Sequence, residues 1–81
     1  MEKLLENIKI VALFMGDAET SINDLNYDSD WNCLMAVVKK ILDLAAEIDE
    51  MEGYYLITDA MPYIDQTFEA CVNFIKQYGD K

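Results

Sequence analysis

Carboxylates are the only side chains in this sequence whose number and spacing could support acid–base chemistry. The chain has 16 aspartates and glutamates and no histidine, and its six basic residues are all lysines. Asp43 and Glu47, like Asp65 and Glu69, lie four residues apart, which places each pair on one face of a predicted helix. Because no arginine or histidine could orient a substrate beside them, we interpret both pairs as solvated helix faces and predict no catalytic residue and no enzyme activity.

Metal binding and thiol chemistry are weakly supported. Residues 24–30 carry acidic or amide side chains at alternate positions, as a calcium loop does. However, Ser29 occupies the sixth position, where that loop needs glycine, and Met35 occupies the twelfth, where a bidentate carboxylate should stand. Cys33 and Cys71 form no C-x-x-C motif and have no neighbouring base, so we predict no metal, no cofactor and a reducing, cytoplasmic setting.

A cluster of five carboxylates is the strongest candidate for a functional surface. It lies at the C-terminal end of the predicted central helix and consists of Asp43, Glu47, Asp49, Glu50 and Glu52. A helix C-terminus carries partial negative charge, so each acid there costs up to about 1 kcal/mol before mutual repulsion is counted. We therefore expect these residues to bind a basic protein. The alternative is that salt screens the acids and that they serve only solubility.

Hydrophobic periodicity predicts three helices. The first runs from Glu2 to Met15 and ends at Gly16. The central helix has an apolar stripe that we expect to face the core, and Asp28 or Ser29, with Asp30, should cap its N-terminus. This stripe consists of Trp31, Leu34, Met35, Val38, Ile41, Leu42, Ala45 and Ile48.

The last predicted helix begins near Pro62, which suits a first turn, and ends before Gly79. Its apolar stripe consists of Ile64, Phe68, Cys71, Val72, Ile75 and Tyr78.

Two short strands are expected between the helices. Ile22–Tyr27 lies in a polar loop, and Tyr54–Thr58 follows Gly53 and is rich in aromatic and branched residues. A lone strand leaves its backbone groups unpaired, so these two should pair with each other or with a second copy of the chain. The predicted fold class is α+β, with three helices and a minimal two-stranded sheet in one domain of residues 1–81.

The stretch YDSDWNCLMAVVKKIL, residues 27–42, resembles the core Y-H-x-S-W-D-W-L-M-P-V-V-x-K-I of a family of short proteins of Bacteroidetes and their phages, to which no activity is assigned. The matching residues are Tyr27, Trp31, Leu34, Met35, Val37, Val38, Lys40 and Ile41. Residues 7–16 and 68–79 resemble the opening and closing helices of that family. The resemblance implies a mobile-element origin and no reaction, and Asp28 stands where the family usually has histidine.

Composition restricts the possible partners. A net charge of −10 repels phosphate backbones, so we expect no direct nucleic-acid binding. A hydrophobic content of 53% exceeds what a thin core can hide, which predicts a homo-oligomer, most simply a dimer. The sequence has neither a positively charged signal peptide nor the about 20 consecutive apolar residues that cross a bilayer, so we expect a cytoplasmic protein with no membrane partner.

Three functions follow from these observations. The leading hypothesis is a non-enzymatic interaction module that presents an acidic face to a basic protein partner. The second is a small-ligand-binding homodimer in which Tyr54, Tyr55 and Tyr63 line an interface cleft. The third, prompted by the resemblance, is a phage-type inhibitor or nucleic-acid mimic.

Overall fold

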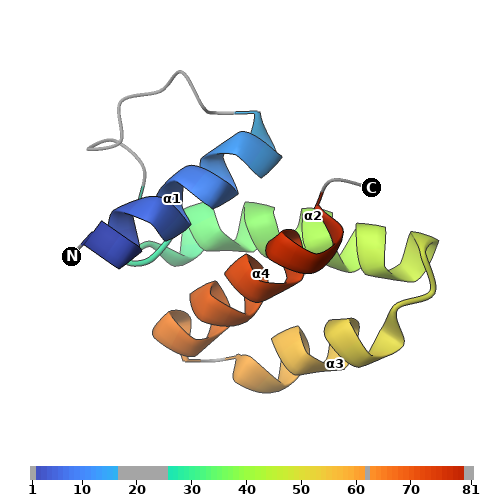
Figure 1. Cartoon of the computed structure of the whole chain (residues 1–81). Coiled ribbons are helices and arrows are strands. Elements are labelled where there is room, and N and C mark those ends of the chain that lie inside the picture. Colours follow the sequence, from blue (N-terminus) through green and yellow to red (C-terminus); the bar gives the residue numbers. More distant parts are fainter. Residues whose placement is uncertain (1, 17–25, 62, 80–81) are drawn as a thin grey trace.

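A computed structural model of the chain describes residues 2–16, 26–61 and 63–79, and these residues are helical apart from the turns between helices. These residues form four α-helices, shown in Figure 1: α1 (Glu2–Met15), α2 (Trp31–Glu47), α3 (Met51–Ala60) and α4 (Ile64–Tyr78). None of the described residues is in a strand. The predicted α+β class with its two-stranded sheet is therefore wrong, and this part of the chain is an all-α, four-helix domain.

The segment Tyr54–Thr58, predicted to be a strand, lies inside α3. Tyr54, Ile57 and Met61 recur at helical spacing and pack on the core, where Ile57 is only 1% exposed. A helix pairs its own backbone groups, whereas this segment has no neighbouring strand among the described residues, so packing overrides the β-propensity of its aromatic and branched residues. Of the other predicted strand, residues 22–25 lie outside the described residues, and Tyr27 is buried in a turn.

Helix α2 begins at Trp31, the first residue of the predicted stripe, and buries most of that stripe. Its buried residues are Leu34, Val37, Val38, Ile41 and Ala45. Met35 is 42% exposed and Ile48 is also exposed, so the predicted inward stripe is wrong at both positions. The N-cap is Asp30 and neither Asp28 nor Ser29, because the Asp30 carboxylate accepts a hydrogen bond of 2.8 Å from the Asn32 N–H.

The bounds of α1 and the role of Gly16 are confirmed. Gly16 adopts a φ of +80°, in the left-handed region that glycine enters at no steric cost, and its N–H donates to the Leu13 carbonyl. The expected last helix is also confirmed, although Pro62 lies outside the described residues, and Gly79 is its C-cap.

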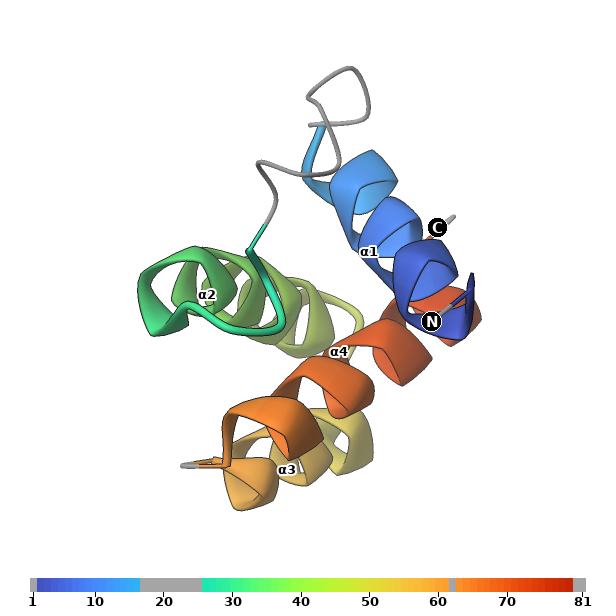
Figure 2. The same ribbon diagram turned by 90° about the vertical axis from the view of Figure 1, so that its left-hand side faces the viewer.

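Helix α4 packs against all three other helices, and both views of the ribbon show it between α1 and α3 (Figures 1 and 2). Its buried residues are Thr67, Phe68, Cys71, Val72, Phe74 and Ile75. Thr67 is the one buried polar residue of the described chain, and its hydroxyl donates to the Tyr63 carbonyl at 2.8 Å. Helix α1 packs chiefly on α4, so α1 and α2 rest on the same helix and diverge from each other (Figure 2).

Close packing of α3 on α4 depends on Gly53, which lies in the first turn of α3. A Cβ atom at this position would lie 2.7 Å from Cε2 and 2.8 Å from Cδ2 of Phe74. These distances are too short for real carbon atoms, and the Phe74 ring is buried. Because Gly53 has no Cβ, α3 can lie close to the Phe74 ring of α4.

Replacing Gly53 with alanine should lower the stability of the protein. Alanine gains at most about 1 kcal/mol in helix propensity, whereas overpacking against a buried ring costs about 1 to 3 kcal/mol. We expect a net loss of about 1 kcal/mol in the free energy of unfolding, measured by urea denaturation. Asp59→Ala, at an exposed position of the same helix, is the control and should be neutral or stabilising. Stabilisation by Gly53→Ala would contradict the close approach of α3 and α4.

Candidate functional site

The five predicted acidic residues do not all lie at the end of α2, because Glu50 is the N-cap of α3 and Glu52 is in its first turn, where acids are favourable. The other three lie in the last part of α2 and in the turn after it, and we call the five residues the acidic corner: Asp43, Glu47, Asp49, Glu50 and Glu52. Eight acidic residues and no basic one lie between Lys40 and Lys76 in the sequence. Within the described part of the chain, the single ion pair joins Lys39 to Asp43 at 3.2 Å, and both side chains are exposed. The other four carboxylates of the acidic corner are therefore not neutralised by a cation of the described chain.

A Schellman motif closes the turn between α2 and α3. The Asp49 N–H donates to the Ala46 carbonyl at 3.3 Å, and the Glu50 N–H donates to the Ala45 carbonyl at 2.8 Å. The motif needs a left-handed residue after the helix, and Asp49 fills that position with a φ of 59°. Glycine is usual there because it has no Cβ. Asp49 thus adds a conformational cost to the electrostatic cost of an acid at a helix C-terminus.

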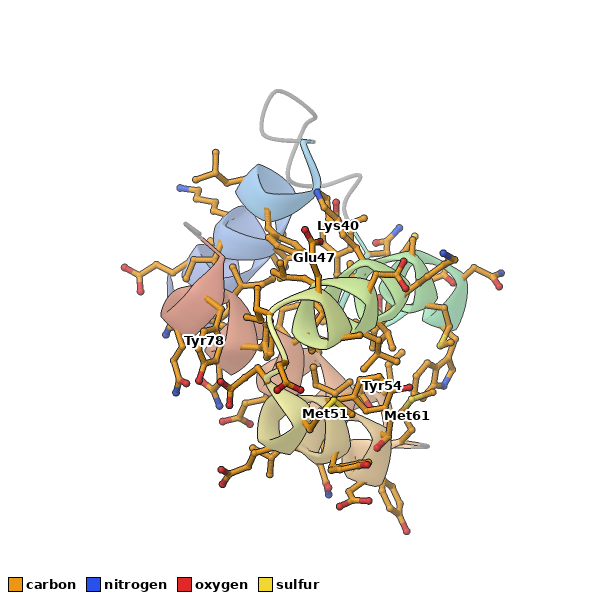
Figure 3. The ribbon with its side chains drawn as sticks, turned by 90° about the vertical axis from the view of Figure 1, so that its right-hand side faces the viewer. Lys40, Glu47, Met51, Tyr54, Met61 and Tyr78 are labelled. Atoms are coloured by element: carbon orange, nitrogen blue, oxygen red, sulfur yellow. The ribbon has the colours of Figure 1, made fainter. Side chains whose placement is uncertain are left out.

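The acidic corner is divided between two sides of the molecule. Glu50 and Glu52 line a hollow of about 350 Å³ between α3 and α4, together with Tyr78. Partial burial raises the pKa of the Tyr78 hydroxyl, and Glu50 raises this pKa further through its negative charge and the hydrogen bond that it accepts, with a smaller effect of Glu52. Glu47 instead projects from α2 toward the α1 side (Figure 3).

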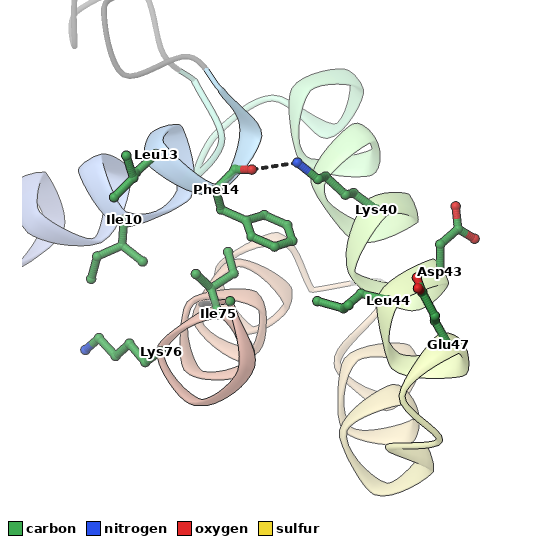
Figure 4. Close-up of a pocket in the computed structure, with 10 residues that line it drawn as sticks. Ile10, Leu13, Phe14, Lys40, Asp43, Leu44, Glu47, Ile75 and Lys76 are labelled. Carbon is green, nitrogen blue, oxygen red and sulfur yellow. Dashed lines mark hydrogen bonds between the residues drawn. The ribbon is translucent and has the colours of Figure 1, made fainter. Parts of the chain in front are cut away.

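Asp43 and Glu47 border a groove of about 830 Å³ formed by α1, α2 and α4 (Figure 4). Its apolar lining comes from all three helices and consists of Ile10, Leu13, Phe14, Leu44 and Ile75. Leu13 is 72% exposed, although leucine is usually buried. The groove exists because α1 and α2 diverge over α4, and we call it the α1–α2–α4 groove.

Lys40 bridges the two walls of this groove. Its Nζ donates to the Phe14 carbonyl at 2.6 Å and lies 4.6 Å from the centroid of the Phe14 ring (Figure 4). Phe14 belongs to the last turn of α1, whose carbonyls lack partners within the helix and favour a nearby cation. The charge of Lys40 is thus engaged with α1.

The apolar wall of the groove was missed by the sequence analysis. Ile10, Leu13 and Phe14 lie outside the apolar stripe that predicts the first helix, and they form a second apolar face that could have indicated an additional contact surface. The stripe of the first helix consists of Leu4, Leu5, Ile8, Val11, Ala12 and Met15. The contact between Lys40 and Phe14 joins residues 26 positions apart. Local spacing rules carry no information about such a pair.

The other residues that could take part in chemistry do not lie together in one site. Burial raises the pKa of the Cys71 thiol to about 12, so this thiol stays protonated at neutral pH and is a poor nucleophile. Cys33 is a second free thiol and is partly buried. Asp65 and Glu69 are exposed on α4. In residues 2–16, 26–61 and 63–79, no group of three or more cysteine or acidic side chains could hold a metal ion.

The three tyrosines of the ligand-binding hypothesis do not share a hollow. The rings of Tyr54 and Tyr55 contact each other edge to face, with centroids 5.7 Å apart. Tyr55 and Tyr63 are both more than half exposed. Neither of them lines the two hollows above, nor the one on α2 to which Tyr54 contributes.

Comparison with known proteins adds no assignment. The chain matches no protein family, no curated protein and no solved structure. The resemblance of residues 27–42 to the family of Bacteroidetes and their phages therefore stays a prediction. Among the described helices, none combines the length and the apolar character that crossing a membrane requires.

Asp49→Gly should stabilise the protein, because it removes both a carboxylate from the helix C-terminus and a side chain from the left-handed region. We expect a gain of about 1 kcal/mol in the free energy of unfolding, measured by urea denaturation at low salt. Asp49→Asn removes only the charge, since asparagine tolerates this region, and it should give a smaller gain that disappears at high salt. A loss of stability in Asp49→Gly would contradict the strained turn.

Lys40→Met should weaken the attachment of α1 while keeping the apolar stem of the side chain. Loss of the charged hydrogen bond and of the contact with the Phe14 ring should cost about 1 to 2 kcal/mol, measured by thermal or urea unfolding. Lys9→Met removes the same charge at an exposed position of α1 and should change stability by less than about 0.5 kcal/mol. Equal effects of the two variants would show that the Lys40 contact contributes nothing specific.

Proposed function

We propose that this chain is a non-enzymatic interaction module that binds a basic amphipathic segment of a protein partner in the α1–α2–α4 groove. The observation that carries the proposal is that Glu47, which has no ion-pair partner in the described chain, lines the same groove as the exposed Leu13 on the opposite side. Apolar contacts in the groove would supply affinity, and the carboxylates would select the sign of the partner's charge.

The α2 side and the α4 side of the groove carry opposite charges. Asp43 and Glu47 border it on α2, whereas Lys76 lies across the groove on α4 (Figure 4). The charge of Lys40 is already engaged by the Phe14 carbonyl. Basic side chains of a bound segment would therefore face α2. The net charge of −10 adds long-range attraction for a cationic partner.

The shape of the groove favours a helix as the bound segment. Its lining comes from three helices, combines apolar with charged side chains and is open to solvent, and a groove of this kind can receive an amphipathic helix. The free thiols of Cys33 and Cys71 are compatible with a reducing compartment, and we place the module in the cytoplasm.

A designed peptide tests this proposal. It should be a helix of about five turns with leucines on one face and lysines on the other, added to the full chain and followed by calorimetry. Leu13→Ser should weaken binding about tenfold, because an apolar contact is lost. Glu47→Gln should weaken it by a few-fold, and added salt should reduce the difference between wild type and Glu47→Gln.

Matched variants away from the groove separate specific binding from general charge attraction. Glu69→Gln on α4 removes the same charge, and Leu56→Ser on α3 removes a similarly exposed leucine. Both should bind the peptide as the wild type does. If they weaken binding as much as the groove variants do, or if a glutamate version of the peptide binds equally well, the proposal is wrong.

A further inference from the structure

A second apolar surface lies where α2 and α3 meet. Figure 3 shows Met51, Tyr54 and Met61 of the α3 segment gathered on the side that faces α2. Met35, Leu42 and Ala46 continue this surface along α2 and border a shallow hollow of about 660 Å³ with Tyr54. We call these six residues the methionine face: Met35, Leu42, Ala46, Met51, Tyr54 and Met61.

The methionine face remains uncovered because of how α2 is oriented. The core takes up the side of α2 that bears Leu34, Val37 and Ile41, which leaves Met35 42% exposed. Met51 is also exposed, at 36%. Two large apolar side chains that the core does not need thus lie on one surface of a small protein, and such patches commonly mark interaction sites. Methionine is flexible and polarisable, which suits it to irregular contacts.

Charge identifies which partner this surface fits. The hollow is bordered by only two charged residues, Lys39 and Asp43, and they pair with each other at 3.2 Å. The hollow is therefore locally neutral on a chain whose net charge is −10, and the unpaired carboxylates nearest to this face are Glu50 and Glu52, which flank Met51 at its edge. A basic partner gains little attraction here. A second copy of the chain, which also carries −10, meets the least repulsion at such a neutral hollow.

We propose that two copies of this chain associate through their methionine faces about a two-fold axis. In an isologous interface each surface meets its own copy, so Lys39 of one copy can approach Asp43 of the other, and the reverse, without any new charge. The exposed pair within each copy becomes two reciprocal pairs across the interface. The homodimer uses helical side chains and no strand pairing. Asp43 borders both this hollow and the α1–α2–α4 groove, so the two proposals share this residue.

Salt should strengthen this dimer. Two chains of charge −10 repel each other, and ions screen that repulsion, while apolar contacts at the methionine face persist. Sedimentation velocity of the full chain should show a larger dimer fraction at about 0.15 M salt than at about 0.01 M. Binding of the basic peptide should show the opposite salt dependence, so failure of one proposal does not imply failure of the other. A chain that stays monomeric under all conditions would contradict the dimer.

Exchange of charges tests the interface itself. Lys39→Glu and Asp43→Lys each place like charges opposite one another in a homodimer, and each should weaken association about tenfold or more. An equimolar mixture of the two variants should restore association, because both reciprocal contacts of the mixed dimer then join a carboxylate to an ammonium group. Both side chains are exposed in the monomer, at 80% and 71%, so circular dichroism should confirm that both variants fold.

The control pair makes the same charge changes on α1, at exposed positions away from the methionine face. Lys9→Glu and Glu6→Lys should not change association, either alone or mixed. If this pair behaves like the Lys39 and Asp43 variants, only net charge matters and the interface is wrong. A mixture of Lys39→Glu and Asp43→Lys that fails to associate would also overturn the proposed reciprocal contacts.

Discussion

The need to cover α4 determines the arrangement of the other helices. Its buried side chains include Phe68, Val72 and Phe74 and spread around much of the helix, so no single neighbour could cover them. Helices α1, α2 and α3 each bury part of this surface. Because α1 and α2 both rest on α4, they separate from each other, and the groove between them follows from how α4 is covered. The surfaces we assign to binding are thus by-products of forming a core in a small domain.

Unfavourable local features are concentrated at the acidic corner. The core has no buried side-chain polar atom without a partner in the described residues, and the Thr67 hydroxyl is satisfied by the Tyr63 carbonyl at the start of its own helix. In contrast, the turn after α2 places Asp49 in the left-handed region, and Glu47 and Asp49 lie at the end of α2, where a helix prefers lysine or arginine. Natural sequences are otherwise locally consistent with their folds, so this turn is the strongest candidate for selection on a property other than stability.

Sequence periodicity predicted α1, α2 and α4 because each helix has a strong apolar stripe. Helix α3 was missed because Tyr54–Thr58 has high β-propensity and follows a glycine, although the spacing of Tyr54, Ile57 and Met61 was helical. The acidic corner could be predicted, since charge at a helix end is a local property. The groove could not, because it arises from the divergence of two helices and from a lysine that binds a carbonyl 26 residues away. The orientation of α2 likewise depended on contacts with α4 that periodicity does not contain.

Because α1 has few contacts with the rest of the domain, binding in the α1–α2–α4 groove is coupled to the local opening of this helix. Helices α2, α3 and α4 contact one another, whereas α1 is held chiefly by α4 and by the Lys40 bridge. Local opening free energies vary within a protein, and the element with the fewest contacts opens first. One wall of the groove therefore belongs to the first helix to detach. A molecule bound in the groove would hold α1 in place and slow amide hydrogen exchange there. Binding would therefore be detected as slower exchange in this one helix.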